Sequence, residues 1–524
     1  MTYNSLQFIL FFAIFLILYL LMPRVRLRQT VILVGNVVFY KLASGFNMLA
    51  VLVGTSLVIY VTGRIIEHIY ADYETKKEGL NPKEAAALFA GYKKHAKKFL
   101  LLAFLVILGI LLYVKIGKLL GFKEVGRITG LLKPKRVLIP LGLSYYTFSG
   151  IGYLLDIYWK KAKCEHDYFK LLVCMTYFPH IVQGPIGRYD KLMKQFGELP
   201  GFSYERVCFG CQRMLWGLFK KMVVADRLAL FTGAVFAAPA QFAGFEIFLA
   251  ALLCTVELYA DFSGCMDIVI GAAETMGVTL DENFRRPFFS KSAAEFWRRW
   301  HITLGTWFKD YVYMPIAMSP RFMKKSVNIR KKRGNRAGQI FSSAIPLAVV
   351  WLLTGLWHGT GADYVAWGCY WGTIIILATI LAPDLKKLTE RLHINTESFG
   401  FQLFRMTRTL LLFAVGRMLT VTGSLTGFAQ LVSGLFKEHR VWTLFDGSLY
   451  GHGLDYKNFC VAVVGILLIW ISDMLGEHMR IRETLAKQPL PLRWFVYYGG
   501  IVLVLIFGMY GAAFDASSFV YGGF

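Results

Sequence analysis

Apolar runs long enough to cross a lipid bilayer recur along this chain, and they constrain its fold more than any other feature. The first extends from Leu6 to Met22 and the last from Trp494 to Tyr510. About 20 apolar residues in a helix match the thickness of the hydrocarbon core. Of the 524 residues, 56% are hydrophobic and only 17% are charged. We therefore expect residues 1–524 to form a single integral-membrane domain, an all-α polytopic bundle of about ten to twelve transmembrane helices.

The positive charge of the chain indicates a membrane rather than a nucleic acid as its partner. The formal net charge is +25, and the Lys and Arg residues lie mostly in short segments between apolar runs. This is the distribution of the positive-inside rule, not of a basic face with interleaved aromatic residues. We expect a multi-pass protein of the cell membrane with anionic lipids as partners and no nucleic acid.

The eight cysteines indicate neither a metal site nor a disulfide framework. One C-x-x-C pair occurs, Cys208 and Cys211. A zinc site needs a second pair, or histidines at ligand spacing, and neither follows in the sequence. We expect these thiols to pack between helices, and we expect no bound metal and no permanently bound cofactor.

Two apolar runs are interrupted in a way that predicts re-entrant or broken helices. The runs are Val137 to Tyr158 and His166 to Gly187, and they contain several glycines together with Pro140, Pro179 and Pro185. Proline removes a backbone donor and kinks a helix, and non-helical backbone at membrane depth is tolerated only where protein or a wet cavity surrounds it. These segments are expected to surround a cavity.

Two further runs, Val207 to Phe236 and Phe245 to Val278, carry charged residues inside apolar sequence. Such residues face the interior of a bundle or a water-filled space, and they pair with one another. Interior pairing is the interpretation that we favour over a functional one. The residues concerned are Lys220, Lys221, Asp226, Arg227, Glu257 and Asp261.

The central stretch from Ser290 to His358 carries the strongest candidates for chemistry. Ser292 and Glu295 have the spacing of a capping box. A stripe that recurs every four residues then predicts one amphipathic helix that ends at Pro315. The stripe consists of Phe296, Trp300, Leu304 and Phe308.

His301 lies on this predicted helix, directly after Arg298 and Arg299. One interpretation of His301 is structural, with a ring N–H donated to a carbonyl group. The two arginines could hold the phosphates of a nucleotide or phosphopantetheine donor, because guanidinium groups match phosphate geometry.

His358 is harder to explain by structure alone. It ends an apolar helix and is followed by Gly359, Thr360 and Gly361, where backbone can approach a substrate closely. A buried imidazole stays neutral and can accept a proton, as a general base must. The spacing to Asp363 resembles the H-x-x-x-x-D of glycerolipid acyltransferases, which we treat as coincidence, keeping only the expectation that Asp363 orients the ring.

The sequence of the central stretch resembles the membrane-bound O-acyltransferase (MBOAT) superfamily. RRPFFSKSAAEFWRRWHITLGTWFKDYVYMPI followed by LLTGLWHG is similar to its signature, and YFPHIVQGPIGRYDKL is similar to a segment of its bacterial branch. That branch includes alginate O-acetyltransferases and teichoic-acid D-alanyltransferases. The match covers about residues 140–372, and the ending DASSFVYGGF is more similar to the alginate type.

The resemblance implies a bundle with a central tunnel, with His358 as the catalytic histidine and His301 as the second functional one. It also implies that an acyl group passes from a cytoplasmic thioester donor, acetyl-CoA or an acyl carrier protein, to hydroxyls of a polysaccharide. An extracytoplasmic acyltransferase is an implied partner in some members. Acetyl transfer is the function that we expect.

Two alternatives stay open at this point. D-alanyl transfer to teichoic acid would use a cytoplasmic carrier protein, which the basic run from Arg321 to Arg336 could dock, although the same run also satisfies the positive-inside rule without a partner. A permease or flippase for a lipid-linked glycan would use the histidines as a proton relay. Transporters commonly show two matching halves, and no such repeat occurs in the sequence.

Overall fold

The structure is a computed structural model, which describes residues 1–125, 136–138, 140–242 and 244–510. The predicted family-type ending DASSFVYGGF lies outside the described residues. The chain divides into two compact units, which are described separately below. The first unit consists of Met1–Met214 with Ile268–Asp281, and the second of Leu215–Asp267 with Glu282–Phe524.

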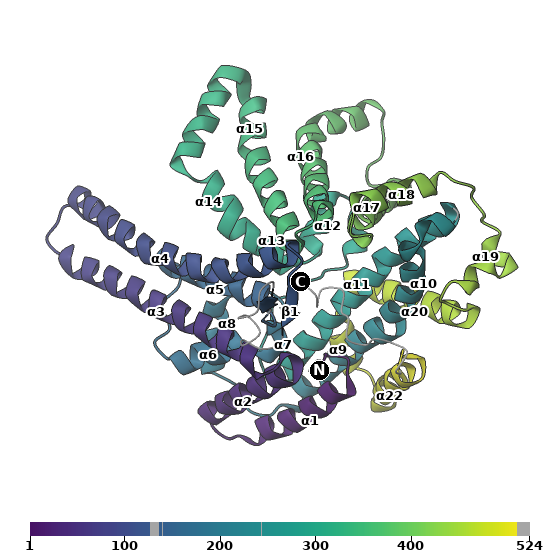
Figure 1. The fold of residues 1–524 in the computed structure, drawn as a ribbon, viewed down its shortest axis with the longest axis horizontal. Coiled ribbons are helices and arrows are strands. Elements are labelled where there is room, and N and C mark those ends of the chain that lie inside the picture. Colours follow the sequence, from purple (N-terminus) through teal and green to yellow (C-terminus); the bar gives the residue numbers. More distant parts are fainter. Residues whose placement is uncertain (126–135, 139, 243, 511–524) are drawn as a thin grey trace. The chain divides into compact units, whose positions relative to one another are not determined.

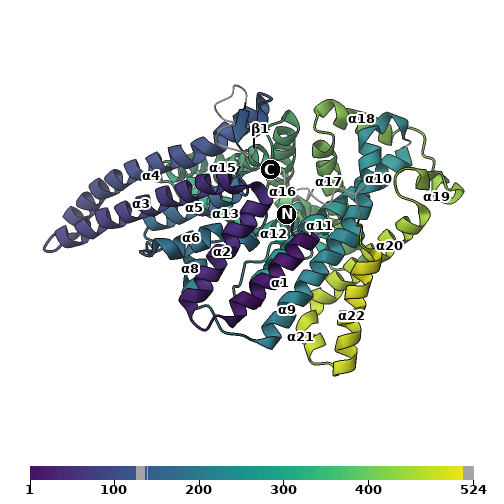
Figure 2. The same cartoon turned by 60° about the horizontal axis from the view of Figure 1, so that its bottom comes forward.

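The first unit consists of helices with one small pair of strands. Helices α3 and α4 are long and run side by side as an antiparallel pair, joined by a short turn (Figure 1, Figure 2). The elements are α1 (Leu6–Leu21), α2 (Val25–Ser44), α3 (Phe46–Lys76), α4 (Pro82–Leu119), β1 (Lys123–Val125), β2 (Arg136–Leu138), α5 (Leu143–Tyr158), α6 (Tyr168–Thr176), α7 (Phe178–Ile181), α8 (Tyr189–Gly197) and most of α9 (Tyr204–Leu218).

Local sequence explains where helix α4 begins. The side chain of Asn81 accepts hydrogen bonds from the backbone of Lys83 and Glu84, and the Glu84 carboxylate accepts one from the Asn81 N–H. Pro82 occupies the first helical position, where no N–H is needed. Outside the three-residue strands β1 and β2, which pair in parallel, the described residues form helices and connecting segments, so the all-α prediction is confirmed.

The two interrupted runs are broken as predicted. The first begins as a helix only at Leu143, after Gly142 adopts a φ of 71° against the backbone of Ile181. The second is split at Tyr177 into α6 and α7. Asn36 secures this break, because its side chain accepts a hydrogen bond from the Phe178 N–H at 2.9 Å and donates to Oγ1 of Thr176 at 2.9 Å.

The second unit contains the helices of the predicted signature. Its elements are a π-helical turn (Phe219–Ala225), α10 (Asp226–Ala237), a 3₁₀ turn (Pro239–Gln241), most of α11 (Gly244–Thr275), a 3₁₀ turn (Pro287–Phe289), α12 (Ala293–Arg299), α13 (Ile302–Phe308), a π-helical turn (Lys309–Tyr313), α14 (Met314–Ala317), α15 (Pro320–His358), α16 (Ala362–Arg391), α17 (Phe399–Val421), α18 (Leu425–Leu435), α19 (Thr443–Asp446), a 3₁₀ turn (Ser448–Gly451), α20 (Tyr456–His478), α21 (Ile481–Ala486) and α22 (Leu490–Phe507).

Helix α15 consists of two limbs. Gly334 has a φ of 88° and a ψ of 167°, which interrupts the helix and turns the chain back on itself (Figure 1). Only glycine adopts this backbone conformation without strain. The second limb runs down to His358 and packs along α16 over its length.

Six helices among the described residues are long and apolar enough to cross a membrane, so the prediction of a polytopic integral membrane protein is confirmed. Shorter apolar helices, Leu6–Leu21 and Leu425–Leu435, add to them, and the predicted number of ten to twelve crossings stays a prediction. The six candidate spans are Leu49–Lys76, Pro82–Leu119, Pro320–His358, Ala362–Arg391, Tyr456–His478 and Leu490–Phe507.

Four of the six charged residues predicted to pair inside the apolar runs form ion pairs in the second unit: Lys220, Lys221, Asp226 and Asp261. Nζ of Lys221 contacts Oδ1 of Asp226 at 2.8 Å and Oδ1 of Asp261 at 2.6 Å. Nζ of Lys220 contacts Oδ2 of Asp267 at 2.5 Å. The same interior contains a hydrogen bond from Thr232 to Glu257 and one from Arg227 to Asn458.

Candidate active site

The chain changes direction at His301, so the prediction of one amphipathic helix from Ser292 to Pro315 is wrong. Helix α12 ends before Trp300, His301 adopts the left-handed conformation (φ 46°, ψ 51°), and α13 begins at Ile302. The N-terminal half of the predicted capping box is present, because Oγ of Ser292 accepts from the Glu295 N–H at 3.2 Å.

A second segment of chain produces this turn. Residues 283–285 pair with 299–302: the Arg285 N–H donates to the Arg299 carbonyl at 2.9 Å, and the Ile302 N–H donates to the Asn283 carbonyl at 3.0 Å. A continuous helix would leave no place for this extended pairing. The left-handed backbone is rare for a residue other than glycine, and such conformations cluster at functional sites.

The side chain of Asn283 holds the same turn. Its Oδ1 accepts from the Thr303 N–H at 3.1 Å and from Oγ1 of Thr303 at 2.9 Å, and it lies 3.2 Å from Nδ1 of His301. Its Nδ2 donates to Sδ of Met266 on α11 at 3.2 Å. Asn283 is fully buried. Sequence analysis missed this residue, because DENFRRPFF has no helical period and no motif that marks Asn283.

The ring of His301 is only 3% exposed and lies among aromatic side chains. Phe262 of α11 meets it edge to face with 4.9 Å between ring centroids, and Trp357 lies at 6.0 Å. Because burial disfavours the imidazolium ion, it lowers the pKa of His301 to about 3. His301, which lies outside the six candidate spans, is therefore neutral at physiological pH.

His358 is the last residue of α15 and is 5% exposed. Its ring lies between two indoles, with centroid distances of 4.6 Å to Trp357 and 4.9 Å to Trp367. Since the Trp357 ring also faces His301, the structure brings the two predicted histidines to the same indole. The two histidines are 57 positions apart in the sequence, and the fold of the second unit brings both rings next to Trp357.

Close packing of α15 against α16 fixes the position of His358. A Cβ atom on Gly355 would lie 2.5 Å from the Tyr364 carbonyl oxygen, and one on Gly368 would lie 2.6 Å from the Trp351 carbonyl oxygen. Small residues allow two helix backbones to approach this closely. Trp297 of α12 packs on Trp367 and Trp351, which connects α12 to the same helix pair.

The other predicted site residues lie nearby in the second unit. Asp363 is buried in the first turn of α16, with its carboxylate against Gly361, and its predicted role in orienting His358 stays a prediction. Arg299 is held by two carboxylates, Glu295 at 3.0 Å and Glu477 at 2.8 Å. Arg298 is exposed. Phosphate binding by either arginine stays a prediction.

The segment YFPHIVQGPIGRYDKL belongs to the first unit and contains a further buried histidine. His180 is in α7, 4% exposed, and its Nδ1 has no hydrogen-bond partner among the described residues. Because it is buried, the pKa of His180 falls to about 4. Sequence analysis quoted this histidine within a motif but assigned it no role.

The chemistry that the second unit offers is that of neutral imidazole in an apolar setting. In the part of the chain that the structure describes, no group of three or more His, Cys, Asp and Glu side chains could hold a metal ion. A neutral histidine can accept a proton from a hydroxyl group, and the aromatic rings packed on both histidines give them an apolar setting. Fold and site together define a polytopic membrane protein with a buried two-histidine centre.

Comparison with known proteins identifies the family. Residues 165–329 match the model of the MBOAT, membrane-bound O-acyltransferase family. A probable alginate O-acetylase of Pseudomonas syringae pv. tomato is 30% identical over 482 residues, which are 90% of this chain and 82% of that protein. The chain therefore belongs to the membrane-bound O-acyltransferase family and is a membrane acyltransferase.

More distant relatives carry other acyl acceptors in their names. A peptidoglycan O-acetyltransferase of Helicobacter pylori is 28% identical over 262 residues, 45% of this chain and 46% of that protein. A teichoic acid D-alanyltransferase of Bacillus subtilis is 28% identical over 245 residues, 45% of this chain and 58% of that protein.

Proposed function

We propose that this protein transfers an acetyl group from a cytoplasmic thioester donor to hydroxyls of an exported or cell-envelope polysaccharide. The observation that carries the proposal is the pair of buried histidines, His301 and His358, on one indole ring in a membrane acyltransferase. The relative that matches 90% of the chain is named an alginate O-acetylase, which supports acetyl as the group and a polysaccharide as the acceptor.

In the proposed reaction, the neutral ring of His358 removes the proton of an acceptor hydroxyl. The hydroxyl oxygen attacks the thioester carbonyl carbon and forms the new C–O bond. The C–S bond then breaks, and the leaving thiolate takes up the proton from the His358 imidazolium, so that ester and thiol are the products. The reaction needs no covalent acyl-enzyme, because the hydroxyl oxygen attacks the thioester directly.

The length of the second limb of α15 sets the distance between the cytoplasmic side and His358, which the acyl donor must bridge. His358 follows Arg336 by 22 residues, which corresponds to about 33 Å along a helix. Arg336 begins the second limb, directly after the basic first limb, which the positive-inside rule assigns to the cytoplasm. A soluble thioester donor would therefore have to reach through most of the membrane thickness to bring its acyl group to His358.

Two alternatives remain. D-alanyl transfer is supported by the shorter match to a teichoic acid D-alanyltransferase, and the chemistry at His358 would be unchanged. A permease or flippase would use the histidines as a proton relay, but membership of an acyltransferase family argues against this class.

The proposal includes the partners and location of the protein. We assign it to the plasma membrane, with acetyl-CoA or an acyl carrier protein as donor and with an extracytoplasmic acyltransferase as a partner that receives or completes the transfer. Anionic lipids are the proposed partners of the first limb of α15. This limb carries only cationic charges, and Met323 and Val327 are exposed on it one helical turn apart.

The test is mass spectrometry of cell-envelope and exported glycans from cells that produce the wild-type protein or His358→Ala. A mass increment of one acetyl group per modified hydroxyl, present only with the wild type, is the expected result. An alanyl increment would instead establish the D-alanyl alternative. Reduced glycan export in the mutant, with no acyl increment in either sample, would overturn acyl transfer in favour of transport.

A further inference from the structure

The hydrogen bonds at Asn283 determine which nitrogen of His301 carries the proton. The Thr303 backbone N–H can only donate, and it points at the Asn283 side chain at 3.1 Å. The atom that it meets must therefore be the amide oxygen, Oδ1. Nδ1 of His301 lies 3.2 Å from the same oxygen, so this ring nitrogen must donate a proton to it.

A neutral imidazole carries one N–H. If Nδ1 of His301 holds the proton, Nε2 has the lone pair and acts as an acceptor. This restricts the function of the ring: neutral His301 cannot donate a hydrogen bond from Nε2 to a developing oxyanion, but it can accept one from a hydroxyl group. The arrangement is that of a histidine oriented through one nitrogen so that the other is available for chemistry.

Asn283 is itself held rigidly. Its backbone carbonyl accepts from the Ile302 N–H at 3.0 Å, and its Nδ2 donates to Met266 at 3.2 Å. It thus contacts the turn at His301 and the start of α13 through both backbone and side chain, and a flip of its amide group would turn an N–H donor toward the Thr303 N–H.

We propose that Asn283 is a positioning residue of the transfer site, which holds His301 as the Nδ1–H tautomer so that Nε2 accepts a hydrogen bond from a hydroxyl of the acceptor next to the attacking one. The functional half of this inference rests on the proposed acyl transfer. In that reaction, His301 orients the acceptor through the neighbouring hydroxyl, while His358 removes the proton of the attacking hydroxyl.

The effect of a charge at position 283 on the protonation of His301 depends on the other charged groups around the ring. The elements packed on its ring present apolar faces, Phe262 from α11 and Trp357 from α15. Asp261, next to Phe262, is paired with Lys221. The nearest other titratable group along α15 is His358, beyond Trp357. A carboxylate at position 283 would therefore place a negative charge directly against Nδ1 of His301.

The first experiment does not depend on turnover. Nitrogen-15 NMR of the full-length protein in lipid bilayers, labelled at its ten histidines, distinguishes protonated from bare ring nitrogens, and His301→Ala identifies the signals of His301. We expect a protonated Nδ1 and a bare Nε2 in the wild type. Asn283→Leu should shift the population toward the Nε2–H form, whereas Thr303→Val, which keeps the backbone donor, should not. Unchanged His301 signals in Asn283→Leu would overturn the proposal.

The second experiment measures acyl increments on glycans per amount of folded protein. Asn283→Leu should lower transfer about 10- to 100-fold, the range found when an outer partner of a metal-bound histidine is lost. Asn283→Asp keeps the accepting oxygen and should restore part of the activity, but its carboxylate favours the imidazolium ion. The acid limb of the pH profile should then move to higher pH, which a merely structural role for Asn283 would not produce.

The proposed base, His358, and the proposed role of Asn283 are tested by different results. If His358→Ala transfers as well as the wild type, the proposed base is wrong, and the tautomer of His301 is still decided by the NMR measurement. If Asn283→Leu and Asn283→Asp lose activity equally at unchanged pH profile and unchanged His301 signals, Asn283 serves only the fold.

Discussion

Nζ of Lys221 lies 2.6 Å from Oδ1 of Asp261, and the next residue, Phe262, places its ring edge to face with His301. A buried ion pair thus adjoins the wall of the candidate site. Lys221 projects from a π-helical turn, a local widening that is frequent at functional sites, and it also contacts Asp226. The network fixes α11, and with it the face on which Phe262 and Met266 contact His301 and Asn283.

We expect Lys221→Met to destabilise the protein by about 3–5 kcal/mol, because Asp226 and Asp261 would be left buried without a compensating cation. Thermal unfolding of the purified protein in detergent measures this loss. Lys386→Met is the matched control, because Lys386 is exposed and its ion pair with Glu390, at 3.9 Å, is exposed as well. Adding Asp226→Asn and Asp261→Asn to Lys221→Met should recover stability, and failure to do so would contradict the electrostatic explanation.

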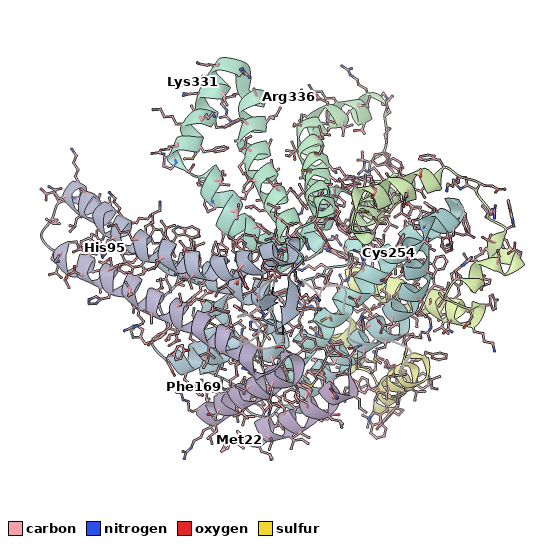
Figure 3. All side chains as sticks on the ribbon, viewed as in Figure 1. Met22, His95, Phe169, Cys254, Lys331 and Arg336 are labelled. Carbon is pink, nitrogen blue, oxygen red and sulfur yellow. The ribbon has the colours of Figure 1, made fainter. Side chains whose placement is uncertain are left out.

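His358→Ala should abolish acyl transfer while the thermal unfolding midpoint changes little. The reason is that the change removes the proposed base but leaves the Trp357 and Trp367 indoles in place. Glycan mass spectrometry gives the activity. His95→Ala is the control, since His95 is exposed on α4 (Figure 3). Near-normal transfer by His358→Ala would remove this residue from the mechanism.

His301→Ala should lower transfer by about two orders of magnitude, the scale of a misplaced reacting group, because the acceptor loses a hydrogen bond that orients it. His301→Gln offers an accepting oxygen on a chain of similar reach and should retain more activity than His301→Ala. Equal activity in wild type and both variants would return His301 to a packing role among Phe262 and Trp357.

Gly355→Ala should reduce acyl transfer at least tenfold, because the substitution displaces His358. The added methyl would lie 2.5 Å from the Tyr364 carbonyl oxygen, so α15 and α16 must separate one turn before His358. Overpacking of this kind costs about 1–3 kcal/mol. Gly109→Ala on α4 is the control: no atom lies within 4 Å of the added Cβ, and alanine favours helix there. Thermal unfolding and glycan acylation are measured for both variants.

The general architecture was accessible from sequence because it depends on local properties. Apolar run length predicted the long helices, prolines and glycines marked the breaks at Gly142 and Tyr177, and the charges of Lys221 and Asp261 predicted interior pairing. The resemblance to the family signature identified His301 and His358 as candidate site residues. What brings these rings to Trp357 is the packing of α12 and α15, which no single-segment pattern contains.

The turn at His301 could not be predicted for the same reason. Phe296, Trp300, Leu304 and Phe308 are all buried, as the four-residue period requires, yet the helix stops between them. The cause is backbone pairing with residues 283–285, a contact distant in sequence. The ion pair of Arg299 could not be predicted either, because its partner Glu477 lies 178 positions away, on α20.

The first limb of α15 provides a prediction about lipid. From Arg321 to Arg336 the chain carries eight Lys and Arg residues and no acidic one. Figure 3 shows Lys331 near the turn of the two limbs and Arg336 where the second limb begins. Stacking of Phe322 on Phe341 and a hydrogen bond from Ser326 to the Gly338 carbonyl hold the limbs together. The cations are therefore presented by an ordered hairpin.

We expect anionic headgroups to protect this hairpin from hydrogen exchange. In nanodiscs that contain phosphatidylglycerol, peptides from residues 320–336 should exchange more slowly than in phosphatidylcholine alone, because each surface cation gains about 1 kcal/mol near an anionic membrane. Replacing Lys324, Lys331 and Lys332 by Gln should remove most of the difference, as should 1 M salt, which screens charges beyond about 3 Å. Met323→Ser with Val327→Ser should weaken protection in both lipids, since burial of exposed apolar side chains in a bilayer does not depend on its charge. Equal exchange in the two lipids, with slowing only when an acidic acyl carrier protein is added, would assign the hairpin to the donor protein instead of the bilayer.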